Sequence, residues 1–111
     1  MSAQLSGPRG VIARHSLTGP LAGFDLVLLD SARASNAAAE HQHPGAVLGY
    51  VLDGQLRFGI NHEAPHVVPA GETFFEPKGA VHTTNESVDA DRSVRFLALL
   101  IVPTGGPLVG A

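Results

Sequence analysis

Turn-forming residues divide this chain into short segments, and their spacing limits the possible folds more than any other feature. The 111 residues include 13 glycines and 8 prolines, which are spread along the chain rather than clustered. Asp53-Gly54, for example, separates two apolar segments with a pair of residues typical of a β-hairpin turn. Short apolar segments joined by frequent turns favour an all-β sandwich or barrel.

The segments between the turns have the length and the Val- and Leu-rich content of strands. Strands are predicted at residues 11–17, 24–29, 46–52, 55–60, 66–68, 72–76, 81–85 and 94–102. The last range is almost continuously apolar, which predicts a place in the middle of a sheet. Residues 31–40 are rich in alanine but lack large apolar side chains at helical spacing, so we expect a loop or an extended edge segment there.

Composition is typical of one small globular domain covering residues 1–111. Hydrophobic residues make up 44% and charged residues 15% of the chain, which is enough apolar content for a single core. The Gly- and Pro-rich tail, residues 103–111, is expected to be loosely held.

Charge and cysteine content exclude several kinds of site. Without cysteine the chain has no disulfide, zinc-thiolate site or cysteine nucleophile. A net charge of −3 without any Lys/Arg cluster argues against a nucleic-acid partner. No apolar stretch approaches the roughly 18 residues of a membrane span, and no signal-peptide pattern is present. We therefore expect a cytoplasmic protein that is not bound to a membrane.

Histidine is the one residue type in excess, with six in the chain. His41 and His43 are two residues apart near the start of a strand, where side chains at i and i+2 leave the same face. The pair could therefore chelate a divalent transition metal. His82 follows the turn at residues 77–79 and could supply a third ligand if the sheet closes into a barrel. Nothing converges on the other histidines, which are His15, His62 and His66.

Two segments resemble the conserved motifs of the cupin superfamily. The stretch His41-Gln42-His43-Pro44-Gly45, followed by the hairpin at Gly54, is similar to the first motif, which has two histidines one residue apart and a hairpin glycine. The stretch from Gly71 through Pro77-Lys78-Gly79 and His82 to Asn85 is similar to the second motif, with its asparagine one residue early. Together they cover residues 41–85. The resemblance implies a double-stranded β-helix, the jelly-roll barrel of cupins, with His41, His43 and His82 as metal ligands.

One position departs from the first motif. The motif normally carries a glutamate ligand three or four residues after its second histidine, and here that position is Val47 or, with the alternative spacing, Leu48. The resemblance therefore implies a three-histidine site without a carboxylate. Three neutral imidazoles leave the +2 charge of a metal uncompensated, which favours an anionic or enolisable ligand. The metal stays open among iron, zinc, nickel, manganese and copper.

The pocket around such a site is less defined by the sequence. Glu76 directly precedes Pro77 and could face the cavity as an acid or base, although we favour a strand-end carboxylate that orients a backbone group or an arginine. The aromatic residues are first of all core candidates, and some would line a cavity if one exists. The pocket candidates are Val47, Tyr50, Phe58, Phe74, Glu76 and Phe96.

Two functions are compatible with these features. The first is a metal-dependent enzyme, most simply an iron-dependent dioxygenase of a small metabolite, because three-histidine sites in cupins occur among dioxygenases of thiols, diketones and aromatic diols. The second is a non-oxidative metal-binding cupin: an isomerase, a cyclase, or a module that binds or senses a small molecule. The sequence does not separate them, since one fold supports many functions. Pairing through exposed strand edges predicts a homodimer.

Overall fold

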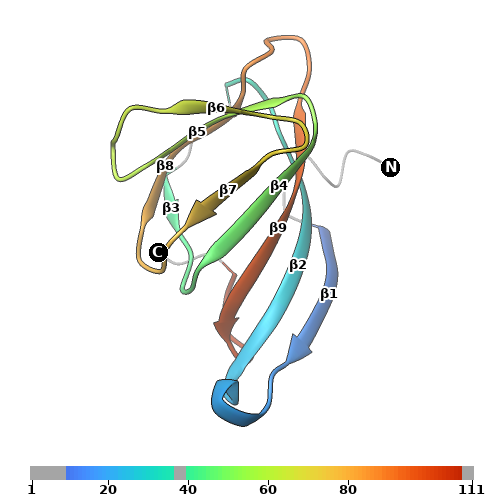
Figure 1. Ribbon diagram of the computed structural model, residues 1–111, viewed down its shortest axis with the longest axis vertical. Coiled ribbons are helices and arrows are strands. Elements are labelled where there is room, and N and C mark those ends of the chain that lie inside the picture. Colours follow the sequence, from blue (N-terminus) through green and yellow to red (C-terminus); the bar gives the residue numbers. More distant parts are fainter. Residues whose placement is uncertain (1–9, 37–39, 109–111) are drawn as a thin grey trace.

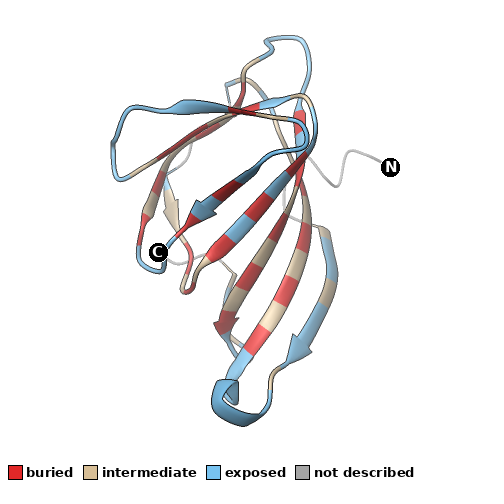
Figure 2. Cartoon of the chain, in the orientation of Figure 1, coloured by how far each residue is buried: buried red, intermediate tan, exposed pale blue. Residues whose placement is uncertain are grey.

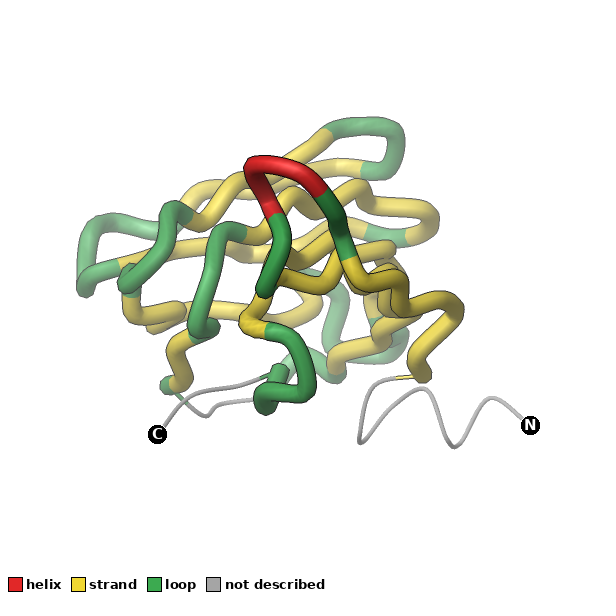
Figure 3. Tube along the Cα trace, turned by 90° about the horizontal axis from the view of Figure 1, so that it is seen from below, coloured by secondary structure: helices red, strands yellow, loops and turns green. Residues whose placement is uncertain are grey.

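The computed structural model describes residues 10–36 and 40–108 and is built almost entirely of strands (Figure 1). One 3-10 turn, η1 (Gly19–Leu21), joins the first two strands and is the red segment in Figure 3. The strands are β1 (Gly10–Ser16), β2 (Phe24–Arg33), β3 (His41–Gln42), β4 (Val47–Asp53), β5 (Gln55–Ile60), β6 (His66–Pro69), β7 (Thr73–Glu76), β8 (Val81–Ser87) and β9 (Val94–Pro103).

The strands form two antiparallel sheets. The first has the order β1-β2-β9-β4-β7 and the second the order β3-β8-β5-β6. After β2 the chain passes from one sheet to the other at every connection except that between β5 and β6. This arrangement confirms the predicted all-β jelly roll. β9 lies between β2 and β4 in the five-stranded sheet, as its nearly continuous apolar sequence predicted.

Alternation along each strand decides which side chains enter the core. On β4, the inward residues Val47, Gly49 and Val51 are buried and the residues between them are exposed, a pattern that Figure 2 shows as alternating bands. Fully burying a side chain such as Leu100 stabilises the fold by about 1.5–3 kcal/mol. The core cluster contains Val27, Leu29, Val47, Val51, Leu56, Phe58, Val68, Phe74, Val94, Phe96, Ala98, Leu100 and Val102.

Two strands extend by two or more residues beyond their predicted ends. β2 continues to Arg33 because its pairing with β9 continues to Val94, at the start of that strand. The first part of the alanine-rich segment is therefore strand, while residues 37–39 lie outside the described residues. β8 extends to Ser87, whose hydroxyl donates a hydrogen bond to the carbonyl of Arg92 at 2.6 Å.

The segment after β9 folds back onto the barrel. The Arg14 guanidinium donates a hydrogen bond to the carbonyl of Gly106 at 3.1 Å, and Leu108 packs against the core. Residues 103–108 are therefore held, which differs from the loose tail that we expected, and residues 109–111 lie outside the described part of the chain. Within the described residues, no helix is long and apolar enough to cross a membrane.

Candidate metal centre

Pairing between β3 and β8 brings two of the three predicted histidines together. His41 lies directly opposite His82, and their ring centroids are 4.9 Å apart. The ring of His43 stands nearly perpendicular to that of His41, with centroids 4.8 Å apart. From the sequence, His82 was expected to come close only through closure of the barrel. In the structure, His41 and His82 are instead neighbours within one sheet, and His43 follows at the end of β3.

A register shift on β8 directs His82 inward. Phe58 of β5 pairs with Asn85, but Ile60 pairs with His82, so one extra residue is inserted on β8 between these positions. Such a bulge changes the face on which the following side chains lie. It allows His82 and Asn85, which are three residues apart, both to be buried on the cavity side.

The main chain fixes the protonation of His43. Its Nδ1 lies 2.6 Å from the carbonyl oxygen of Leu108, and a carbonyl can only accept a hydrogen bond. Nδ1 therefore carries the proton and Nε2 presents a lone pair, the arrangement typical of histidine ligands of metals. Leu108 was not among the predicted site residues, and a backbone acceptor leaves no signal in the sequence.

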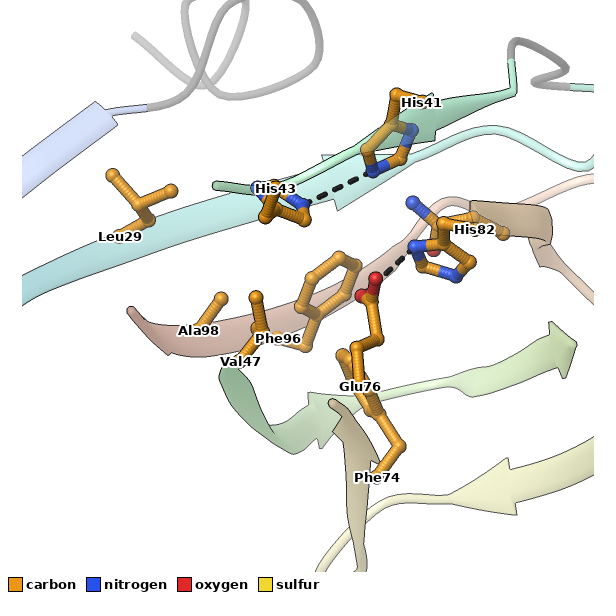
Figure 4. A pocket seen from close by; sticks show the side chains of 10 residues that line it. Leu29, His41, His43, Val47, Phe74, Glu76, His82, Phe96 and Ala98 are labelled. Atoms are coloured by element: carbon orange, nitrogen blue, oxygen red, sulfur yellow. Dashed lines mark hydrogen bonds and ion pairs between the residues drawn. The ribbon is translucent and has the colours of Figure 1, made fainter. Parts of the chain in front are cut away.

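The spacing of the ring nitrogens fits two ligands of one ion. His41 Nε2 and His43 Nε2 lie 3.1 Å apart, as the dashed line in Figure 4 shows. Nitrogen ligands at neighbouring positions of an octahedral ion, each about 2.1 Å from the metal, lie about 3.0 Å apart. Without an ion the two nitrogens are at hydrogen-bond distance, and the same spacing is compatible with both imidazoles binding one metal.

Glu76 of β7 brings a carboxylate to the same place. Its Oε2 lies 3.0 Å from Nδ1 of His82, and both side chains are almost completely buried. One ligand atom each from His41, His43 and Glu76 falls within 4.8 Å of the others. Glu76 thus faces the cavity rather than an arginine at the strand end, and the structure differs from the carboxylate-free site implied by the resemblance. One sequence signal pointed this way: Phe74 and Glu76 are two residues apart on a strand and share its inner face.

Several buried polar atoms at this place make no hydrogen bond within the described residues. They are Glu76 Oε1, both ring nitrogens of His82, and Asn85 Oδ1. The 3.0 Å approach of Glu76 to His82 is an ion-pair distance without hydrogen-bond alignment. An unsatisfied buried polar group costs about 1–3 kcal/mol, so a cluster of them requires an explanation. A bound cation would satisfy both the imidazole lone pairs and the carboxylate, so this donor set fits a divalent transition metal.

Apolar side chains surround the polar cluster. Leu29, Val47, Phe74, Phe96 and Ala98 line the cavity together with the three histidines, Glu76 and Asn85 (Figure 4). The cavity has a volume of about 10 Å³, which is room for about one water molecule or one ion. The apolar lining lowers the local dielectric and strengthens any charge interaction inside.

The pocket candidates separate into three groups. Val47, Phe74, Glu76 and Phe96 line the cavity. Phe58 is buried behind it, with its ring centroid 4.9 Å from that of His82. Tyr50 is 44% exposed on the outer face, because it is one residue out of step with the inward positions of β4.

The remaining histidines lie away from the cluster. His15 is exposed on β1. His62 is exposed in a turn, with Nε2 3.6 Å from a carboxylate oxygen of Glu40. His66, on β6, stacks edge-on against Phe58. None of the three lines the cavity.

Solved structures similar to this chain support the fold. A double-stranded β-helix protein from Klebsiella pneumoniae covers 100% of this chain and 96% of its own length, with 16% identity and a TM-score of 0.66. The match to protein NMB1881 from Neisseria meningitidis covers 86% of this chain and 84% of that protein, with 14% identity and a TM-score of 0.60. Fe(II) HppE in complex with substrate matches 68% of this chain at 20% identity, with a TM-score of 0.61. This chain spans 45% of the length of that HppE structure.

Sequence comparison gives the family. No curated protein matches the chain. The Cupin domain family matches residues 32–100, a range that includes His41, His43 and His82 and all of the four-stranded sheet. The match covers more than half of the chain, and the chain therefore belongs to the cupin domain family.

Proposed function

We propose that this protein is a metal-dependent cupin enzyme that binds one divalent transition-metal ion through His41, His43 and His82. The observation that carries the proposal is the 3.1 Å spacing of the His41 and His43 Nε2 atoms, with the His43 proton held on its other nitrogen. The unsatisfied nitrogens of buried His82 support it.

Iron is the first metal to test. Fe(II) HppE, which has a similar fold, was solved with iron and substrate together, and imidazole ligands suit Fe(II). When bound, such a metal would supply Lewis-acid activation of a small substrate or of dioxygen. The chain's own residues would hold and orient this centre: the Leu108 carbonyl keeps the tautomer of His43, and Phe74 and Phe96 exclude water from one side.

The size of the cavity limits the substrate. The cavity of about 10 Å³ has room for about one ion and little beside it, so we infer that only a small polar group of a metabolite reaches the metal. The apolar lining from Val47 and Leu29 favours a partly apolar metabolite.

The proposed reaction is oxidation by dioxygen, and an oxygen electrode tests it directly. Protein loaded anaerobically with Fe(II) is mixed with thiols, diketones and catechols in turn, and oxygen uptake is measured against the His43→Ala variant. We expect uptake with one of these classes and none with the variant. Metal binding without uptake across the panel would overturn the dioxygenase proposal and favour the non-oxidative alternative, an isomerase, cyclase or sensing module with zinc or nickel.

Location and further partners stay predictions. A cytoplasmic location and the lack of a nucleic-acid partner still rest on the sequence alone. A fluorescent fusion observed in cells tests the location, and a membrane or extracellular signal would contradict it.

A further inference from the structure

Val47 and Glu76 form a cross-strand pair between β4 and β7. Residues directly opposite each other in antiparallel strands project from the same face, with their Cβ atoms about 4.5–5.5 Å apart. Both side chains are 2% exposed and both line the cavity. The resemblance to the cupin motif places its glutamate at position 47 or, with the alternative spacing, at position 48, and Glu76 lies on the strand next to position 47.

The Glu76 carboxylate reaches the histidine cluster from there. Oε2 lies 3.0 Å from His82 Nδ1, and Oε1 makes no hydrogen bond to any described residue. A ligand oxygen of Glu76 lies within 4.8 Å of ring nitrogens of both His41 and His43. In Figure 4 the carboxylate of Glu76 points toward the ring of His82.

A bound cation would also offset the charge of the Glu76 carboxylate. In the described part of the chain, the only ion-pair partner of this carboxylate is the ring of His82, and no lysine or arginine contacts it. Leaving a buried carboxylate without a full positive charge is strongly unfavourable. A divalent ion held by the neighbouring imidazoles would provide that charge.

We propose that Glu76 is a metal ligand, supplied from β7 in place of the carboxylate that Val47 cannot supply from β4. This proposal rests on the proposed function, because it assigns a fourth ligand to the same centre. The three imidazoles are neutral, so the single carboxylate would reduce the net charge of the metal centre from +2 to +1. The mixed nitrogen and oxygen donor set suits iron, zinc or manganese better than copper(I), which prefers sulfur ligands.

The competing role for Glu76 is to orient His82 without touching the metal. A carboxylate of that kind hydrogen-bonds to the non-ligating nitrogen of a histidine ligand, and its loss typically reduces metal affinity by about 10–100-fold. The two roles can be distinguished by moving the glutamate from position 76 to position 47. A glutamate at position 47 could bind the ion from the adjacent strand, but it would not reproduce the 3.0 Å contact between Glu76 and His82.

Exchange of the two side chains tests the proposal. The affinity for Fe(II) and for Co(II) is measured anaerobically by competition with a chromophoric chelator, on wild type, Glu76→Val and the double variant Val47→Glu/Glu76→Val. We expect Glu76→Val to lose at least about 100-fold in affinity and the double variant to return to within about 10-fold of wild type. The Co(II) absorption spectrum reports the ligand set independently of affinity. Glu72→Gln, an exposed glutamate in the preceding turn, is the matched control and should behave as wild type.

Two results would overturn the assignment. If the double variant folds but keeps the low affinity of Glu76→Val, Glu76 orients His82 and is not a ligand. If the double variant does not fold, the Glu76→Gln variant is measured instead, because glutamine has the shape of glutamate without its charge. Affinity of Glu76→Gln within about 10-fold of wild type would then exclude the ligand role, whereas a loss of at least about 100-fold supports it.

The design also separates this inference from the proposed function. If wild type binds neither metal, the metal centre itself is wrong. If wild type binds and His43→Ala does not, but Glu76→Val binds as wild type, the three-histidine centre stands and only the fourth ligand fails.

Discussion

The ring of Phe74 lies directly over Gly49, its partner on the neighbouring strand. A β-carbon placed on Gly49 would be 2.0 Å from Cζ of that ring, which is closer than atoms can approach. The absence of a side chain at Gly49 therefore allows Phe74 to lie across β4 and to pack against Phe58 and Phe96, with centroids 4.8 Å and 5.4 Å away. Phe74 and Phe96 of this cluster line the cavity.

Substituting Gly49 with alanine is expected to displace the Phe74 ring and lower the free energy of unfolding by about 1–3 kcal/mol, the range for overpacked cores. Urea denaturation measures this cost. The control is a double-mutant cycle with Phe74→Ala, in which Gly49→Ala should cost clearly less because the clash is gone. Equal costs in both backgrounds would contradict the contact.

Binding of a metal should stabilise the fold through the histidines. A ligand at a concentration of 100 times its Kd raises the free energy of unfolding by about 2.7 kcal/mol when it binds only the folded state. We expect a thermal shift with Zn(II) or Fe(II) for wild type and for His62→Ala, an exposed histidine in a turn. His43→Ala should lose the shift, and elemental analysis should fall from one ion per chain toward none. A shift of equal size in His43→Ala would place metal binding elsewhere.

Asp25 is expected to make the free energy of unfolding depend on pH. The Arg14 guanidinium, 2.7 Å away, and the hydroxyls of Ser16 and Thr104 lower the pKa of this carboxyl from 3.8 to about 2. Because the folded-state pKa lies below that of the unfolded chain, the unfolded state takes up a proton first as the pH falls. The contribution of Asp25 is therefore complete above about pH 4 and is lost as the pH approaches about 2.

The variant Asp25→Asn should unfold at a lower temperature than wild type at pH 7, and the difference should shrink between about pH 4 and pH 2. Thermal unfolding followed by circular dichroism across this range measures it. Asp89→Asn, an exposed aspartate in the loop before β9, is the control. Curves for Asp25→Asn and wild type that stay parallel down to pH 2 would exclude this ion pair as the source.

A homodimer is predicted from the open edge of the five-stranded sheet. β7 is an edge strand, and its Phe75 is 55% exposed opposite Leu48, which is 48% exposed. Light scattering should give about twice the chain mass of 11.5 kDa, and Phe75→Lys should shift the protein toward monomer. A wild-type protein that is monomeric at micromolar concentration would contradict the prediction.

Local patterns predicted most of the fold. Alternation and turn residues located the strands because both depend on neighbours in the sequence, and the apolar run at 94–102 predicted the central strand correctly. The end of β2 was missed, since the pairing that extends it to Arg33 comes from β9, about sixty residues later in the chain. Pairing between distant strands has no signature in local composition.

The candidate site was only partly predictable for the same reason. The spacing of His41 and His43 predicted that they share a face, because that relationship is local. The position of Glu76 beside the histidines depends on its register with Val47, which no local pattern specifies. The bulge that turns His82 inward has no local signal either. Tyr50 lies outside the pocket although the sequence predicted it there, because apolar residues on both faces of β4 hide the alternation of that strand.

The hydrogen bond from His43 to Leu108 limits how this protein can vary during evolution. Its acceptor is a main-chain carbonyl, so residue 108 can be replaced by almost any amino acid without removing it. Selection on this hydrogen bond would act on the path of the chain, whereas the packing of Leu108 against the core depends on its side chain. Insertions or deletions between β9 and residue 108 should therefore be tolerated far less well than substitutions at the same positions.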